Sequence, residues 1–177
     1  MATSQSAGAK TARKSSGRKR RTNRRDPLAI TLLKKDHREV EGWFDEYEQL
    51  DDDADKLELF GKIALALKVH TQIEEEIFYP EERGDVEDDM MDEAYVEHDG
   101  AKKLIAEIEA MKPGDEFYDA KVKVLGEYIK HHVKEEEQPG GIFAQAKKGH
   151  EDLDAMGERM QARKEELMAE MGGAKPN

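Results

Sequence analysis

Residues 70–80 read HTQIEEEIFYP, and this segment sets the main constraint on how the chain can fold. It continues a helical pattern in which apolar residues such as Ile63 and Leu67 recur every three or four positions. The next two positions of the same stripe are His70 and Glu74. Polar groups on the buried face of a helix are unfavourable unless a partner satisfies them, so the rest of the chain must supply that partner.

Three further amphipathic patterns each place one histidine on an apolar stripe. In the first it is His37, and in the third it is His98. The fourth offers two neighbouring histidines. Placing residues about 100° apart puts His132 and Glu136 within about 40° of the apolar stripe, whereas His131 lies about 100° or more away. We therefore predict that His132 and Glu136 face the core and that His131 flanks it.

The four patterns are separated by short segments rich in aspartate, glycine and proline. They cover approximately residues 27–50, 54–79, 86–111 and 115–137. Connections this short favour antiparallel neighbours, which predicts an all-α, up-down-up-down antiparallel four-helix bundle. Asp26 is expected to cap the first helix, with Pro27 in its first position.

The chain divides into three parts. Residues 1–25 form a predicted disordered basic tail, and residues 26–148 form the bundle. Residues 149–177 form an accessory helix and tail, in which apolar residues after Gly149 recur at helical spacing. This helix is expected to lie on the bundle or on a partner. Its apolar positions are Leu153, Met156, Met160, Leu167 and Met171.

The inward histidines agree in height along the bundle. We estimate the height of each histidine from its distance to the end of its helix, at about 1.5 Å per residue. Histidines on successive helices then differ in height by roughly one helical turn or less. A single core histidine is more often a hydrogen-bonded core residue, and a histidine–glutamate pair one turn apart is often a surface pair. Several histidines in register with two matched glutamates are hard to obtain by chance. Because buried carboxylates need a compensating charge, we predict a metal site. Its residues are His37, His70, Glu74, His98, His132 and Glu136.

Composition excludes several other chemistries. The chain has no cysteine, so disulfides, thiolate metal sites and cysteine nucleophiles are absent. All four serines lie within the first 16 residues, which excludes a serine–histidine nucleophile in the folded part. No apolar run approaches the roughly 18 to 20 residues that span a bilayer, and we expect a cytoplasmic protein without a membrane partner.

These motifs together resemble the hemerythrin-like HHE cation-binding domain over roughly residues 27–148. The matching elements are Lys35-Asp36-His37, residues 70–80, Glu97-His98 followed by Lys102-Lys103-Leu104-Ile105, and His132-Val-Lys-Glu-Glu136-Glu. The resemblance implies four antiparallel helices and a di-iron centre with the six residues above as ligands. Manganese and zinc are alternatives, although bridging glutamates suit iron or manganese better than zinc. The repeated His-x-x-x-Glu-Glu unit suggests a duplicated helical hairpin.

The sequence departs from oxygen-carrying hemerythrins at two positions. Lys102 stands where the carriers have a fifth histidine, and Glu137 stands where they have an aspartate. The resemblance therefore favours iron binding with sensing of, or reaction with, oxygen, NO or peroxide. A di-iron oxidase or peroxidase is the enzymatic version, but no substrate pocket is recognisable. Whether Glu75, Glu137 or His131 joins the ligand set stays open, and His150 is expected to be exposed.

The N-terminal segment carries nine Lys or Arg residues and no acid. Removing its nine charges from the net charge of −12 leaves −21 on the remainder. Residues Lys10 to Arg25 are a candidate for non-specific binding of nucleic acid, as in a stress or nucleoid-associated protein that uses the bundle as a scaffold. The alternatives are a solubilising tail that folds back on the acidic body and a transit peptide, although the segment lacks an apolar face.

Overall fold

The computed structural model describes residues 25–150 and 152–173. Over these residues the chain is all-helical, as predicted, and its only strand-like feature is an isolated bridge between Arg83 and Val86. The basic segment, residues 1–24, lies outside the described part. The helical elements are α1 (Leu28–Tyr47), α2 (Asp53–Ile73), η1 (Glu74–Phe78), α3 (Tyr79–Glu82), α4 (Asp88–Glu109), α5 (Tyr118–Glu137), α6 (Ile142–Gly149) and α7 (Leu153–Gly172).

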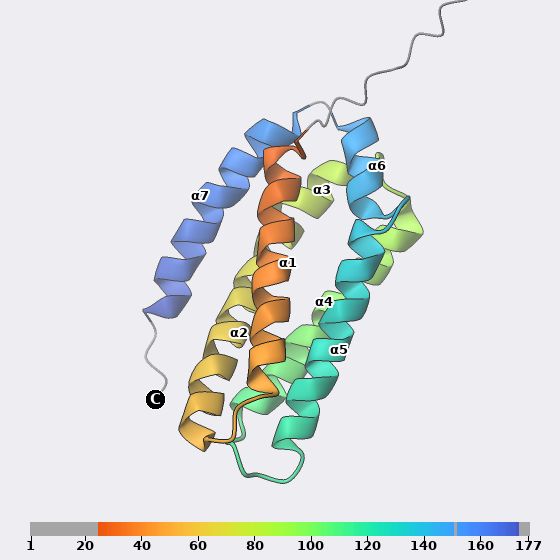
Figure 1. The fold of residues 1–177 in the computed structure, drawn as a ribbon. Helices are drawn as coiled ribbons and strands as arrows, with labels where there is room; N and C mark the ends of the chain where they lie inside the picture. The colour runs from red at the N-terminus through yellow and green to blue at the C-terminus, as the bar shows by residue number, and fades with distance from the viewer. Residues whose placement is uncertain (1–24, 151, 174–177) are drawn as a thin grey trace, which may run out of the picture.

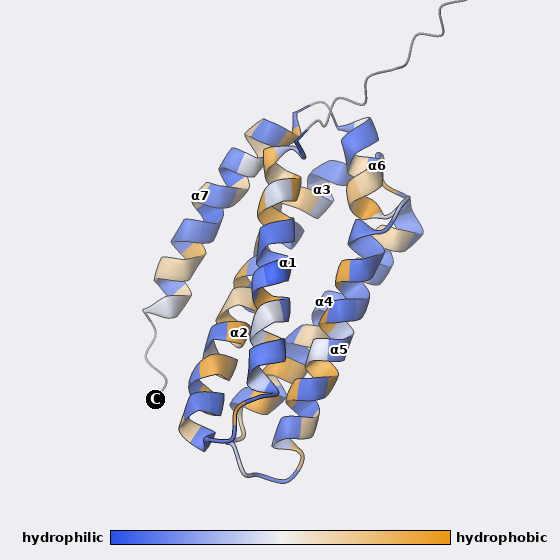
Figure 2. Cartoon of the chain, viewed as in Figure 1, coloured by the Kyte–Doolittle hydropathy of each residue, from blue (hydrophilic) through white to orange (hydrophobic). Residues whose placement is uncertain are grey.

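The long helices α1, α2, α4 and α5 lie side by side, and successive ones run in opposite directions (Figure 1). Helix α1 packs against α2 and α5, and α4 packs against α5 and α2. Polar and apolar residues alternate along each of these helices (Figure 2), as burial of one face requires. No helix in the described ranges is long and apolar enough to cross a membrane.

The apolar core is divided into two clusters by a polar layer. Along α1, Leu33 belongs to one cluster and Val40 to the other, with His37 between them. Along α4, Ala94 and Ala101 are divided in the same way. All six residues predicted to bind metal are buried in the layer that separates the two clusters.

The second predicted helix is interrupted at this layer. Helix α2 ends at Ile73 and is followed by the π-helical turn η1, in which the amide of Tyr79 donates to the carbonyl of Glu74. In a regular α-helix Tyr79 would lie about 180° from His70 around the axis. The extra residue of a π-helical turn brings it back to within about 80°, toward the interior.

The start of α1 differs from the prediction. Asp26 does not cap the helix, because its carboxylate pairs with the ammonium groups of Lys34 and Lys147. The amide of Leu28 instead donates to Asp154 of α7, at 2.7 Å. Charge-assisted bonds to two lysines are stronger than a single bond to a backbone amide, which explains the change of partner.

The predicted accessory helix is present as α7 and packs against α1 and α2. Leu153, Met156, Met160 and Leu167 are buried in the core, and Met171 packs at its edge. A short helix, α6, precedes α7 and was not predicted. It contributes Ile142, Phe143 and Ala146 to the same cluster, so that α6 and α7 extend the core.

The contact between α7 and α1 depends on a glycine. A Cβ atom at Gly157 would lie 2.4 Å from the backbone nitrogen of Ala29, whereas one at Gly61 in α2 would meet nothing within 4 Å. We predict that Gly157→Ala lowers the free energy of unfolding by about 1 to 3 kcal/mol through overpacking. The control Gly61→Ala should raise it by about 0.5 to 1 kcal/mol.

Urea unfolding followed by circular dichroism measures both changes. A stabilised Gly157→Ala variant would show that α7 does not pack closely on α1 in solution.

Candidate metal centre

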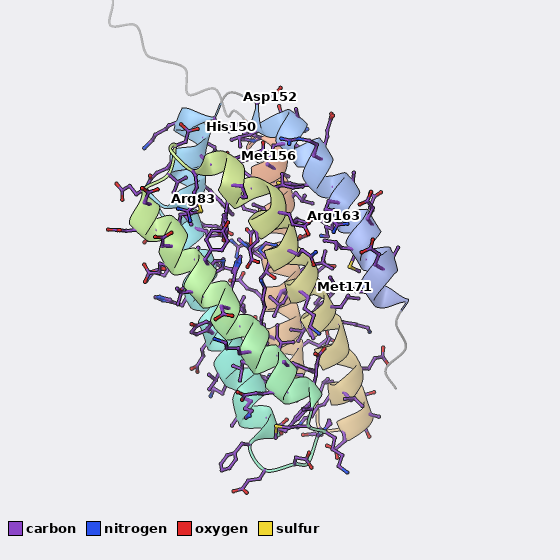
Figure 3. The ribbon with its side chains drawn as sticks, turned by 180° about the vertical axis from the view of Figure 1, so that it is seen from behind. Arg83, His150, Asp152, Met156, Arg163 and Met171 are labelled. Atoms are coloured by element: carbon purple, nitrogen blue, oxygen red, sulfur yellow. The ribbon has the colours of Figure 1, made fainter. Side chains whose placement is uncertain are left out.

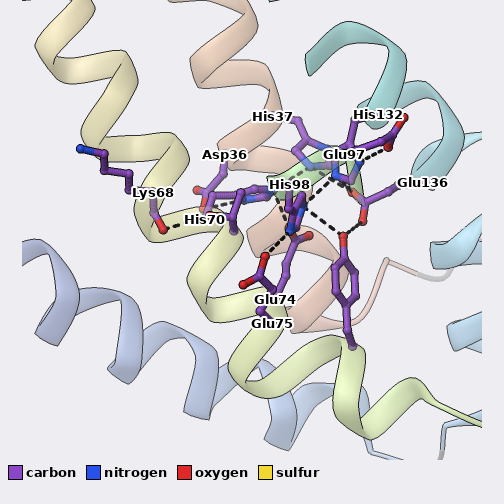
Figure 4. A network of polar contacts seen from close by, with 12 residues as sticks. Asp36, His37, Lys68, His70, Glu74, Glu75, Glu97, His98, His132 and Glu136 are labelled. Atoms are coloured by element: carbon purple, nitrogen blue, oxygen red, sulfur yellow. Dashed lines mark hydrogen bonds and ion pairs between the residues drawn. The ribbon is translucent and has the colours of Figure 1, made fainter. Parts of the chain in front are cut away.

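Four histidines meet at the centre of the polar layer, each with its Nε2 atom directed inward (Figure 4). His37 and His70 form one pair, with their Nε2 atoms 3.1 Å apart. His98 and His132 form a second pair, with a corresponding distance of 3.2 Å. The angular estimate for the fourth helix is confirmed, since His132 is buried while the side chain of His131 is 57% exposed.

The two predicted glutamates lie between the histidine pairs. The Oε2 atom of Glu74 is 3.2 Å from Nε2 of His70 and 3.4 Å from Nε2 of His98. The Oε2 atom of Glu136 is 3.3 Å from Nε2 of His37 and 3.7 Å from Nε2 of His132. Each carboxylate therefore reaches from one histidine pair to the other.

The outer nitrogen of every central histidine faces a carboxylate. Nδ1 of His37 lies 2.8 Å from Glu137, and Nδ1 of His98 lies 3.0 Å from Glu75. Glu75 and Glu137 thus stand behind the histidines and are not directed at the centre as further ligands. An acceptor on Nδ1 keeps the proton on that nitrogen and leaves the Nε2 lone pair for a metal ion.

The two remaining outer carboxylates were not predicted. Glu97 lies 2.7 Å from Nδ1 of His132, and Asp36 lies 3.6 Å from Nδ1 of His70. Each is the residue immediately before an inward histidine of the neighbouring helix, in the dipeptides Asp36-His37 and Glu97-His98. An acidic residue directly before a core histidine was the sequence signal that could have identified Asp36 and Glu97, because that position faces the adjacent helix of the same hairpin.

Three of the four outer carboxylates are held in turn by a lysine or arginine side chain nearer the surface, and the fourth faces a histidine. Lys102 binds both oxygens of Glu75 at 2.6 Å, and Lys164 of α7 binds Asp36. Arg38 binds Glu137, and His131 lies 3.6 Å from Glu97. Lys102 is therefore turned away from the centre. This outer layer fixes the carboxylates and hence the orientation of the four imidazole rings.

The centre has the properties of a cation site. Glu74 is completely buried, and neither of its carboxylate oxygens has a hydrogen-bond partner; the same is true of Oε2 of Glu136. If two imidazole nitrogens bind one ion at about 2.1 Å each, with a right angle between them at the ion, the nitrogens lie about 3 Å apart. The distances within the two histidine pairs are close to this value. The donor set and its unsatisfied charge both fit bound metal.

When no metal is bound, protons neutralise part of the negative charge of the central carboxylates. Burial lowers the pKa of His37, but the close carboxylates of Glu136 and Glu137 outweigh this effect and raise the pKa to about 9. Burial and the neighbouring Glu136 raise the pKa of Glu74. Burial alone would raise the pKa of Glu136 as well, but the charges of His132 and His37 hold it low. A metal ion that enters the centre must displace the protons on its ligands.

Comparison with known proteins accounts for this arrangement. The profile of the Hemerythrin HHE cation binding domain matches residues 28–139, which is more than half of the chain. The chain belongs to this family. The HHE domain match begins at the start of α1 and extends just beyond α5.

A curated relative of the HHE protein is a DNA nickase from Nostoc sp. (strain PCC 7120 / SAG 25.82 / UTEX 2576), which is 27% identical over 154 residues. The alignment covers 86% of this chain and 43% of the relative, so the chain spans less than half of that protein's length. No solved structure matches the chain.

The HHE centre has an internal two-fold pattern. The acid before the first histidine of each hairpin faces the second histidine of the same hairpin. The acid after each central glutamate faces a histidine of the other hairpin. This repetition agrees with the duplicated hairpin suggested by the sequence. Tyr79 breaks it: its hydroxyl donates to Oε1 of Glu136 at 2.9 Å and lies 3.3 Å from Nε2 of His98. Gly141 occupies the corresponding position after Glu136.

The outer carboxylates give a testable prediction. We expect Glu97→Ala to weaken metal binding about 10- to 100-fold, because the ring of His132 loses the acceptor that orients it. The matched control is Asp99→Ala, two residues later in α4, since Asp99 is exposed and pairs with Lys103.

Competition for metal with a chromophoric chelator measures both affinities. Equal affinities for Glu97→Ala and the unmodified chain would show that the outer layer does not tune the centre.

Proposed function

We propose that the protein is a non-haem di-iron protein of the hemerythrin type that senses or reacts with oxygen, NO or peroxide. His37 and His70 would hold one ion, and His98 and His132 the other. Glu74 and Glu136 would contact both ions. The observation that carries the proposal is that two buried carboxylates lie between two pairs of inward imidazole nitrogens. The four long helices then serve as the up-down-up-down bundle that holds this layer.

The donor set favours iron over zinc. Structural zinc sites take four ligands in a closed tetrahedron, whereas carboxylates shared between histidine-bound ions suit iron or manganese. Bound iron would supply one-electron redox chemistry toward small oxygen- or nitrogen-containing molecules. The buried layer would hold the ions away from solvent. The hydroxyl of Tyr79 donates to Oε1 of Glu136, which leaves Oε2 directed at the histidines.

The protein ligands leave room for a further molecule. The side chain of Lys102, at the position of the carriers' fifth histidine, is bound to Glu75 and supplies no ligand to the centre. A centre with open positions and without that histidine favours reaction or sensing over reversible carriage. Among the described residues, six side chains supply the proposed ligands, which is few for two ions of octahedral preference.

A small cavity of about 170 Å³ reaches the centre beside His132 and Glu136. Its volume suits a molecule of a few atoms. Its lining is rich in carboxylates, which favours entry of cations and neutral molecules over anionic substrates. The acidic residues that line it are Glu93, Glu97, Glu135 and Glu136. This access supports a small reactant and gives no sign of a site for a large organic substrate.

Anaerobic loading with ferrous iron, followed by exposure to air, tests the proposal. We expect about two irons per chain and new near-ultraviolet absorption, both lost in His70→Ala and Glu74→Ala. The control His131→Ala should keep both, because the side chain of His131 is exposed and outside the central layer. Peroxide turnover above the Glu74→Ala background would favour an enzyme over a sensor.

Absence of stoichiometric iron in the unmodified chain would contradict the di-iron proposal. Full iron content in Glu74→Ala would contradict the role of the buried carboxylates. Stoichiometric manganese or zinc in place of iron would support the metal site but would contradict the proposed iron chemistry.

A second candidate function is non-specific binding of DNA through the basic segment from Lys10 to Arg25. It is supported by the nine positive charges of that segment and by the similarity to the Nostoc DNA nickase. The relative is more than twice the length of the aligned region, and its nicking activity is not carried over to this chain. Contacts made by lysine and arginine with phosphates supply sequence-independent affinity that falls steeply with salt.

Removal of residues 1–25 tests this candidate. We expect the full chain to shift duplex DNA in an electrophoretic assay at low salt, and the truncated chain to lose most of that shift while keeping its iron. Binding that survives both the truncation and raised salt would show that the basic segment is not the DNA-binding element.

A further inference from the structure

A second group of metal-binding side chains lies at the end of α3, outside the central layer. It consists of Glu82, Asp85 and His150, each of which offers one ligand atom within 4.8 Å of the others. His150 is at the connection between α6 and α7, at the same end of the molecule as α3 (Figure 3). The expectation that His150 is exposed is wrong, since only 20% of its side chain is accessible.

Glu82 is the unusual member of this group. It has no accessible surface, and neither carboxylate oxygen has a hydrogen-bond partner. Nδ1 of His150 lies 3.2 Å from its Oε1 atom. Burial, together with the charges of Asp85 and Glu81, raises the pKa of Glu82 to about 7. A buried carboxylate without hydrogen bonds is unfavourable unless a proton or a cation neutralises it.

The arginine side chains near Glu82 are paired with other carboxylates. Arg159 of α7 binds both oxygens of Glu81, and Arg83 pairs with Asp92 and Asp88. In the described part of the chain, no lysine or arginine lies within ion-pair distance of Glu82. The local cations therefore leave the negative charge of Glu82 uncompensated.

The backbone fixes the three donors close together. The amide of Asp85 donates to the carbonyl of Glu82 at 3.0 Å, in a turn that passes through Gly84 at a φ of +105°. The carboxylate of Asp85 then lies against Gly149, where a Cβ atom would come within 2.3 Å of its Oδ1 atom. The amide of His150 donates to the carbonyl of Ala146 in α6 at 3.0 Å, which fixes the backbone of His150 at the end of that helix.

We propose that Glu82, Asp85 and His150 form a second divalent-cation site, separate from the central layer and suited to zinc or a similar borderline ion. Two carboxylates and one imidazole are the mixed oxygen and nitrogen donors that such ions accept, with a fourth position left for water. A bound ion would tie the end of α3 to the connection between α6 and α7. It would thereby hold the start of α7, whose Asp154 caps α1.

Zinc binding to the full chain tests this site. We expect the unmodified protein to bind one more equivalent of zinc than Glu82→Gln or His150→Gln, in a chelator-buffered titration with excess magnesium to mask weak acidic sites. Glu81→Gln is the matched control, since Glu81 is exposed and paired with Arg159. It should bind as much zinc as the unmodified chain.

Glu82→Gln removes an uncompensated buried charge and should stay folded. The zinc-dependent rise in melting temperature should be smaller in this variant than in the unmodified chain. The Glu74→Ala variant separates the two sites, because the zinc that it loses comes from the central layer. Adding Glu82→Gln to Glu74→Ala should remove one further equivalent of zinc. Equal zinc binding by the unmodified chain and by both Glu82→Gln and His150→Gln would overturn the proposal.

Discussion

The carboxylates of Glu74 and Glu136 are buried in the middle of a helical core, and the residues around them are arranged to meet their charge. Neither side chain has accessible surface, and three of their four oxygens lack a hydrogen-bond partner. Four imidazoles surround them, four acids orient the imidazoles, and two lysines and one arginine hold three of these acids. Burial of this many polar groups is understandable if a bound cation supplies the missing charge.

The same constraint explains local features of the helices. The π-helical turn after Ile73 brings Tyr79 toward the interior, where its hydroxyl binds Glu136. Because Glu136 has this bond and Glu74 has no equivalent, the two carboxylates are chemically different although their surroundings repeat. Lys164 links α7 to the layer through Asp36, so the accessory helix contributes to the centre as well as to the core.

Much of this could be predicted from the sequence, because helical periodicity fixes which side chains face inward. It separated His132 from His131, and it correctly placed all six proposed metal-binding residues at buried positions. Asp36 and Glu97 were missed because they face a neighbouring helix, and their role depends on packing between helices. The end of α2 and the cap of α1 were also wrong, since a π-helical turn and the two lysines around Asp26 have no single-helix signature. His150 was misplaced for a similar reason, because its contact with Glu82 joins distant parts of the chain.

We propose that two ions occupy the polar layer, with Glu74 and Glu136 between them. Anomalous diffraction at the iron absorption edge, from crystals of the iron-loaded protein, is the most direct test. We expect two peaks per chain, one next to Nε2 of His37 and His70 and the other next to Nε2 of His98 and His132. A single peak, or peaks outside this layer, would rule out a paired site.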